Sequence, residues 1–541
     1  MKLGTILHID RQLIHDSIYF FGLCLLVMAT PTSRYMMSVS QLLIAMNWFF
    51  EGHFREKFRR FSECRAAWLF AGIFGIHILG LSWSSDIMHG IFDDMKDKLP
   101  TLTLTFFLVS SKPLSKHRLY VLLWLFSASV VLASIAGLIV YHTGSYVDGR
   151  KVMPFIPHVY FSMMVVFVMV LLPWLTHQYT VKPRLMLASY AAVLWLLVYL
   201  FILSSITGLL CLAGVVVFLA AREVLTRKNV WLRAAAVVLL LAATGISVGI
   251  TYKMYRNVNK VVPLEKNYSE AKTSLGNPYT HYDHSDLREN GHLVFHFIAE
   301  DELRSAWNER STLDYDGSDL TGQALSHTLF RYMSSLGLRK DKEGLKALGD
   351  DDIHAVETGI PNYLYLKWPK ALVRLHQTVW EVYQYRKTGN PTGHTFSQRL
   401  ELWRASYRAF LEKPVLGWGT GDIYIAVDFG LNEINSQMAN FRMKPHNQFL
   451  LFLLLFGAAG SFAIYALYVL YIRRTNAYKY LPFNVFLIIM LISMTGNNPY
   501  DAQTGQTFFC IVSLFFGALL NRHENSKGKP ASDNTLPESS N

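Results

Sequence analysis

The chain has 541 residues with 51 Lys+Arg against 39 Asp+Glu, so its formal net charge is +12. Only 17% of its residues are charged, 52% are hydrophobic, and the mean hydropathy is +0.23. Soluble domains carry about 25% charged residues, so this composition argues against an ordinary soluble enzyme and against a disordered or collagen-like chain.

The positive charge lies outside one long polar segment, residues 253–445. That segment holds 24 basic and 24 acidic side chains, which leaves 27 basic against 15 acidic for the rest. The excess lies in short connectors between apolar runs, where membrane topology places it. No nucleic-acid partner is therefore expected. All four cysteines also lie outside this segment, so we expect no disulfide within it.

Twelve apolar runs approach the roughly 20 residues that span a bilayer. They lie at about 13–30, 35–50, 66–82, 99–111, 119–142, 157–175, 185–203, 206–221, 234–252, 446–471, 481–496 and 507–521. The first run has no cleavage site and is expected to be retained. We predict an all-α polytopic membrane protein, with about nine transmembrane helices in residues 1–252 and about three in 446–521.

The basic residues also predict the orientation of the chain. Seventeen of them lie in connectors on one side of the membrane and five on the other, which places both termini in the cytoplasm. Residues 253–445 then lie outside, between the ninth and tenth helices, and their apolar spacing predicts a mainly helical external domain. Residues 522–541 are expected to form a disordered cytoplasmic tail.

Pro445-His446-Asn447 directly precedes an apolar run and is the most informative stretch. A helix that begins here places His446 at the membrane surface, beside backbone N–H groups that attract phosphate. A neutral imidazole there can take a proton from an attacking hydroxyl. A polar residue that merely marks a helix start is the competing interpretation. Gly457 and Gly460 follow, and we interpret them as helix-packing residues.

A second cluster precedes this stretch. Arg399 and Trp403 share one face of a predicted amphipathic helix that also carries Arg404 and Arg408, and the glycine-rich sequence KPVLGWGTGD follows. Arginine side chains suit phosphate oxygens. An ordinary solvated helix is the alternative for any single arginine, and no Walker motif is present.

Other polar groups are weaker candidates. His281 and His284 could ligate a metal, but surface polarity is the favoured interpretation, and no metal site is predicted. Asp501 and Gln503 lie in an outer connector and could face the substrate, or cap a helix.

The sequence HNQFLLFLLLFGAAG fits the pattern His-[Asn/Ser/Gln]-x9-Gly-x-x-[Gly/Thr/Tyr] at His446, Asn447, Gly457 and Gly460. The stretch QRLELW…KPVLGWGTGD fits Arg-x3-Trp…Pro-x-x-Gly-x-Gly. These motifs resemble the superfamily of O-antigen ligases, O-antigen polymerases and protein O-oligosaccharyltransferases. NPYDAQTGQTFF and the long polar segment look like its Bacteroidota branch.

The resemblance implies a multi-pass glycosyltransferase of the C type in the bacterial inner membrane, with residues 253–445 in the periplasm. Such enzymes take a glycan from undecaprenyl diphosphate and pass it, with inversion and without metal or other cofactor, to lipid A–core, another glycan or a protein. His446 would activate the acceptor hydroxyl and Arg399 would hold the diphosphate. Arg404, Asn447, Asp501 and Gln503 are further substrate-binding candidates. Membrane lipids surround the helices.

One position departs from the family pattern. The family commonly has an arginine at the outer end of a mid-chain helix, where this chain has Ile206. Arg150 or Lys151 could supply the missing charge.

Two other classes compete with the transferase. A transporter of lipid-linked sugars would show internal repeats and charges within its helices, and neither is evident. A receptor would need a larger cytoplasmic part. Among transferases, the motif spacing favours a ligase, while polymerase and protein glycosylation stay open.

Overall fold

The computed structural model describes residues 11–143, 152–178, 182–226 and 230–520. The chain divides into two compact units. Unit 1 comprises the described residues of 1–143, 150–219 and 399–541, and unit 2 comprises those of 220–398. These boundaries differ from the expected ones, because residues 220–252 group with unit 2 and residues 399–445 group with unit 1.

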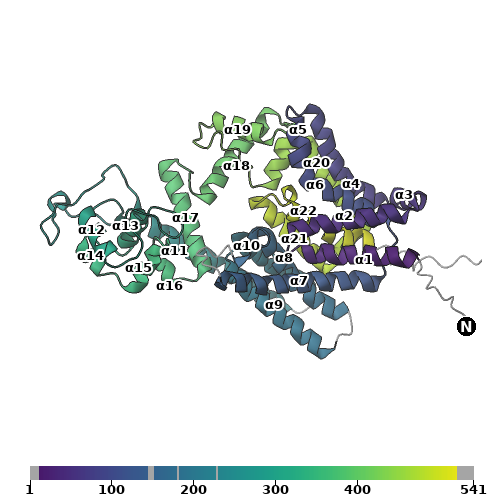
Figure 1. Ribbon diagram of the computed structural model, residues 1–541, viewed down its shortest axis with the longest axis horizontal. Coiled ribbons are helices and arrows are strands. Elements are labelled where there is room, and N and C mark those ends of the chain that lie inside the picture. Colours follow the sequence, from purple (N-terminus) through teal and green to yellow (C-terminus); the bar gives the residue numbers. More distant parts are fainter. Residues whose placement is uncertain (1–10, 144–151, 179–181, 227–229, 521–541) are drawn as a thin grey trace, which may run out of the picture. The chain divides into compact units, whose positions relative to one another are not determined.

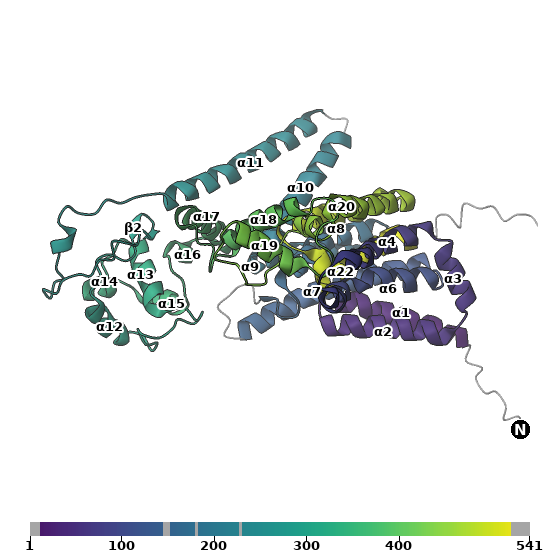
Figure 2. The ribbon, with the colours of Figure 1, turned by 90° about the horizontal axis from the view of Figure 1, so that it is seen from above.

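Unit 1 is built from helices (Figure 1). They are α1 (Arg11–Ala29), α2 (Arg34–Glu51), α3 (Phe54–Ser62), α4 (Arg65–Gly80), α5 (Ile87–His89), α6 (Lys96–Ser110), α7 (Lys116–Thr143), α8 (His158–Gln178), α9 (Pro183–Leu203), most of α10 (Ile206–Thr226) and α18 (Thr395–Glu412), α19 (Ile423–Glu433), α20 (Gln448–Thr475), α21 (Leu481–Gly496) and α22 (Gln503–Leu514). Short 3-10 or π segments are η1 (Leu81–Trp83), η2 (Gly90–Met95), η5 (Ala477–Lys479), η6 (Pro499–Asp501) and η7 (Phe515–Leu519). Helices α1 and α2 lie side by side in Figures 1 and 2.

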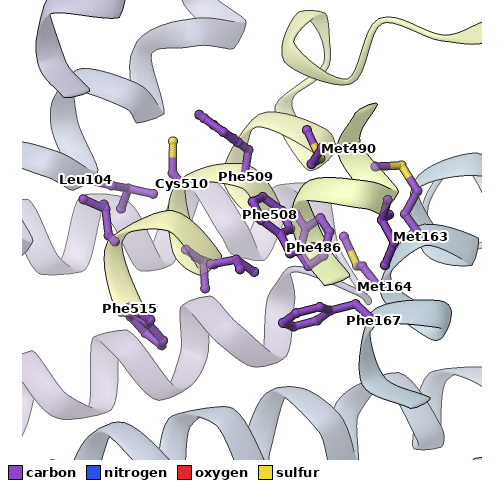
Figure 3. Close-up of a cluster of buried hydrophobic side chains, with 14 of the residues drawn as sticks. Leu104, Met163, Met164, Phe167, Phe486, Met490, Phe508, Phe509, Cys510 and Phe515 are labelled. Atoms are coloured by element: carbon purple, nitrogen blue, oxygen red, sulfur yellow. The ribbon is translucent and has the colours of Figure 1, made fainter. Parts of the chain in front are cut away.

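Helix α8 is at the centre of the unit 1 core, in contact with α7, α9, α21 and α22. Figure 3 shows how its Met164 and Phe167 lie among aromatic side chains of the C-terminal helices, including Phe486 and Phe508. The Phe508 ring stacks on Phe126 at 5.9 Å and meets Phe486 edge-on at 5.5 Å. Because lipid is as apolar as these side chains, close packing of this kind holds membrane helices together.

Seven of the twelve predicted spans coincide with described helices long and apolar enough to cross a membrane. They are α1, α4 with η1, α7, α8, α9, α10 and α20. Helix α21 and the α22–η7 segment are apolar but shorter. The expectation of a helical, multi-pass chain is met, while a full count of twelve spans stays a prediction.

Unit 2 is also mainly helical, with an irregular stretch before its first short helices. Its helices are α11 (Val230–Val258), α12 (Glu300–Asn308), α13 (Leu325–Ser335), α14 (Lys342–Lys346), α15 (Asp350–Glu357), α16 (Leu364–Lys367) and α17 (Lys370–Thr388), with a 3-10 turn η4 (Tyr268–Glu270). Strands β1 (Arg288–Glu289) and β2 (His292–Leu293) pair antiparallel across Asn290-Gly291. Trp307, Tyr315 and Tyr332 are fully buried in its core.

Helix α20 is broken at Gly457, where φ is 60° and ψ is −166°. The break frees backbone groups on both sides, and a loop from the glycine-rich stretch pairs with them. Trp418 N donates to Leu454 O at 2.8 Å and Gly419 N to Leu455 O at 2.9 Å, while Ala458 N donates to Pro414 O at 2.8 Å. Gly457 therefore allows a close approach between a helix break and a loop, whereas we expected it to pack two helices.

Gly460, the other predicted packing residue, lies in the second half of α20. A Cβ atom there would come 2.5 Å from Phe456 Cβ and 3.8 Å from Ile76 Cγ2 of α4. Helix α20 packs along α4, so this position is consistent with close helix packing.

Replacing Gly457 with alanine should destabilise the protein. A left-handed φ costs an L-residue about 1–2 kcal/mol, and the new Cβ would also collide with the carbonyl oxygen of Val415. The midpoint of thermal unfolding in detergent should fall. Gly75→Ala is the matched control, because that glycine lies in α4 with nothing within 4 Å of an added Cβ. Equal midpoints for the two variants would contradict the proposed role of the break.

Candidate active site at the head of helix α20

His446 lies two residues before the start of α20, as the sequence predicts. Asn447 is the N-cap, and its side-chain oxygen accepts from the N–H groups of Phe449 at 3.0 Å and Leu450 at 3.1 Å. Its side-chain amide donates to Thr495 O at 3.2 Å. Asn447 thus has a structural role at this helix end, and its predicted substrate contact stays a prediction.

The backbone of His446 has a φ of 48°, which is the left-handed region. Few residues other than glycine adopt this conformation, and those that do are concentrated at functional sites. The surrounding contacts must therefore hold the turn in place.

Helix α18 supplies one of those contacts. Trp403 Nε1 donates to Pro445 O at 2.9 Å, so the indole is hydrogen-bonded to the residue directly before His446. Arg399 lies one turn earlier on the same face, and its Nη1 is 3.6 Å from the place of a Cβ on Gly496. The two motif stretches singled out in the sequence meet here, and the charge of Arg399 acts on His446.

A network of four charges, in which Lys98, Asp94 and Asp501 are buried and Lys444 is partly exposed, fixes the other side of the turn. Asp501 accepts from Lys98 at 2.7 Å and from Lys444 at 2.5 Å. Asp94 lies 3.6 Å from Lys98 and 3.4 Å from Lys444. Two lysines and two aspartates cancel, which satisfies the rule that buried charges are paired.

This network gives Asp501 a structural role as a counter-ion of Lys98 and Lys444. Burial alone would raise the pKa of Asp501, but the charges of the two lysines outweigh it and hold the pKa well below the ordinary aspartate value. The carboxylate stays ionised at neutral pH and ties Lys444, two residues before His446, to η6 and to Lys98 of α6.

These elements border an open cavity of about 380 Å³ in unit 1. It is lined by Tyr160, Arg442, Met443, Lys444, His446, Asn497, Asn498 and Asp501. Because Lys444 is balanced within the network, Arg442 is the cation of this wall that has no carboxylate partner in the described part of the chain. Its guanidinium lies over the ring of Tyr424, 5.2 Å from the centroid.

The cavity favours a neutral imidazole. Burial lowers the pKa of His446, the positive charge of Arg399 lowers it further, and Asp501 opposes both. His446 is therefore in the proton-accepting form at neutral pH, beside cations that can hold an anionic group.

Residues 363–465 match a family model described as O-antigen ligase. This stretch of the chain is similar to the O-antigen ligase family. The resemblance inferred from the motifs is thus confirmed, and the matched range includes Arg399, Trp403 and His446. No curated protein matches the chain.

Two predicted substrate-binding residues lie away from this cavity. Arg404 is exposed on α18, while its neighbours Leu402 and Ala405 face the core. Gln503 donates to Ser38 Oγ at 2.8 Å, at the start of α2. Neither residue lines the cavity, and their contact with substrate stays a prediction.

The departure at Ile206 lies next to the cavity. Ile206 begins α10, and the following Thr207 accepts a hydrogen bond at 3.0 Å from Asn497, which lines the wall. Arg150 and Lys151, the expected substitutes for the missing arginine, lie outside the described residues.

Sequence reasoning missed Arg442, Lys444 and the cavity residues Tyr160, Asn497 and Asn498. The clustering of Arg442 and Lys444 just ahead of Pro445-His446 was the available signal. His281 accepts from Phe297 N at 3.3 Å, and within the described ranges no group of three His, Cys, Asp or Glu side chains is placed to hold a metal ion.

Proposed function

We propose that the protein is a membrane glycosyltransferase that moves a glycan from undecaprenyl diphosphate to a hydroxyl group, acting as an O-antigen ligase on lipid A–core. The observation that carries the proposal is the placement of His446, a neutral imidazole that lines one cavity with Arg442 and is acted on by the charge of Arg399. The match of residues 363–465 to the O-antigen ligase family supports the reaction class.

The proposed reaction needs one base and an anion-binding wall. His446 accepts the proton of the acceptor hydroxyl, whose oxygen forms a bond to the anomeric carbon from the side opposite the leaving group. The bond from that carbon to the diphosphate oxygen breaks, and the diphosphate leaves with the electron pair. Fixed cations that stabilise this charge lower the barrier, and inversion follows from the single displacement.

Arg442 supplies the charge that is missing at Ile206 in this proposal. Arg442 lines the cavity, and the residue after Ile206, Thr207, accepts a hydrogen bond from the cavity residue Asn497. The described residues contain no carboxylate that neutralises Arg442. Its guanidinium can form paired hydrogen bonds to phosphate oxygens. Arg399 approaches from α18 and completes the diphosphate site without a metal ion or another cofactor.

The proposed topology follows from the basic connectors. The chain crosses the inner membrane about twelve times as a transferase of the C type, with both termini in the cytoplasm and the head of α20 at the periplasmic face. The polyprenyl carrier then presents its diphosphate at that face, within reach of the cavity.

The glycans that accumulate or are lost when the gene for the protein is deleted identify the acceptor. Lipid-linked polymer that accumulates beside bare lipid A–core supports the ligase. Core carrying a single repeat indicates a polymerase, and unglycosylated proteins indicate a protein O-oligosaccharyltransferase. Carrier-linked glycan that crosses proteoliposomes without any transfer product indicates a transporter and contradicts the proposal.

Replacing His446 with alanine should reduce glycan transfer about 10²–10⁴-fold, which is the usual contribution of a general base. Transfer is measured with purified protein and lipid-linked donor, and membrane insertion is checked by fractionation. His117→Ala is the control, because that histidine is exposed near the start of α7. Wild-type transfer by the His446 variant would refute the assignment.

The rate of transfer should depend on pH through His446. Because the neutral imidazole is active and its pKa is lowered, kcat/KM should be constant near neutrality and fall only below the ordinary histidine pKa of about 6.5. Arg399→Gln removes a positive charge and should move this acid limb to higher pH. Arg404→Gln, on the exposed face of α18, should leave the limb unchanged. If the acid limb of the Arg399 variant stays at the wild-type pH, the charge of Arg399 does not lower the pKa of His446.

Replacing Arg442 with glutamine should lower kcat/KM about 10–100-fold, since hydrogen bonds to charged groups contribute about 1.5–3 kcal/mol. Arg442→Lys keeps the charge and should recover part of the rate. Transfer is assayed as above, with Arg404→Gln as the matched arginine control. A rate for Arg442→Gln equal to that of the control would show that another cation holds the diphosphate.

A further inference from the structure

Unit 2 contains a cavity of about 190 Å³, apart from the residues assigned to transfer. Three segments form it: residues 262–265 of the irregular stretch, 292–297 around β2, and 337–340 between α13 and α14. Its charged or titratable side chains are Glu265, His292, His296, Arg339 and Lys340.

Lys340 is the unusual member of this wall, because only 2% of its surface is exposed. Its Nζ donates to the backbone oxygens of Leu293 and His296, both at 3.0 Å. An ammonium group has three donors, and no carboxylate among the described residues pairs with this one. A buried cation without a counter-ion is costly, so the site favours an anion from outside.

The rest of the wall does not supply that anion. Glu265 is paired with Arg339 at 3.1 Å, so these two charges cancel. His296 Nε2 is 3.0 Å from Asp283, and that carboxylate is largely exposed. Around His292, burial and the charges of Lys260, Lys340 and Arg288 all lower the pKa, which shows that its charged neighbours are positive.

The backbone holds this arrangement firmly. Lys340 N donates to Phe297 O and Ala299 N donates to Lys340 O, both at 2.8 Å. Gly337 has a φ of 75°, and a Cβ there would lie 3.1 Å from the His292 ring. These contacts fix the backbone of Lys340 beside residues 297–299 and bring Gly337 close to His292.

We propose that this cavity binds the carboxylate or phosphate group of an acidic saccharide, with Lys340 as its counter-ion. That the anion is carried by a sugar rests on the proposed function, because glycan transferases handle such residues. The oxyanion site itself rests on the geometry of unit 2 alone.

Burial lowers the pKa of Lys340 to about 7, so the free site is mostly neutral at pH 8. An oxyanion binds the charged form, and complex formation at pH 8 should take up as much as one proton. The proton uptake distinguishes binding that forms an ion pair with Lys340 from binding elsewhere on the surface.

The test is calorimetric titration of the full-length protein in detergent with glucuronate, glucose 6-phosphate and glucose. We expect at least one acid to bind at pH 8 with a heat that depends on the ionisation enthalpy of the buffer, and glucose not to bind. The acid that binds identifies the source of the oxyanion. The assay contains no lipid-linked donor, so its result is independent of transfer activity.

Lys340→Met should weaken the binding at least about tenfold and abolish the proton uptake, while thermal unfolding stays cooperative. Lys346→Met, on the exposed side of α14, is the matched control and should bind as the wild type does. Absence of binding by both acids, equal binding of glucose, or wild-type binding by Lys340→Met would each overturn the proposal. Buffer-independent heats in the wild type would do the same, even if the Lys340 variant failed to fold.

Discussion

Backbone groups in an apolar bundle must find hydrogen-bond partners, since each unsatisfied group costs several kcal/mol. The break in α20 at Gly457 creates such groups, and the loop through Pro414, Trp418 and Gly419 satisfies them. The loop continues directly from α18, so its docking also fixes where that helix ends. Because the docked loop fixes the end of α18, Arg399 and Trp403 of that helix lie at the head of α20.

Electrostatics in the same region follow from burial. Four charged side chains form a set with no net charge, in which each lysine is paired with both aspartates: Lys98, Lys444, Asp94 and Asp501. Breaking a buried pair is far more costly than losing an exposed one. The set therefore holds the residues before His446 in place. Arg442, which lines the same cavity, has no carboxylate partner in the described part of the chain.

Local sequence signals predicted the helices and the head of α20 well, because apolar runs and a polar stretch before them are local features. The charge network could not be predicted this way, since Lys98 and Asp501 are 403 residues apart. Gly457 was misjudged for a different reason. Apolar residues flank it without interruption, and nothing in that pattern reports a positive φ. Asp501 was recognised as a site candidate, yet its partners, and hence its structural role, became evident only from the fold.

The hydrogen bonds between the loop and the break in α20 limit which segments of this chain can be exchanged with those of other proteins. Residues from Arg399 to Gly457 form one interlocked piece, in which a helix, a loop and a half-helix share hydrogen bonds. An exchange of segments with a similar protein would preserve the head of α20 only if this piece were transplanted whole. The natural crossover point lies just ahead of Thr395, where α18 begins, close to residue 398 where unit 2 ends. Variation in unit 2 can thus accumulate without disturbing His446.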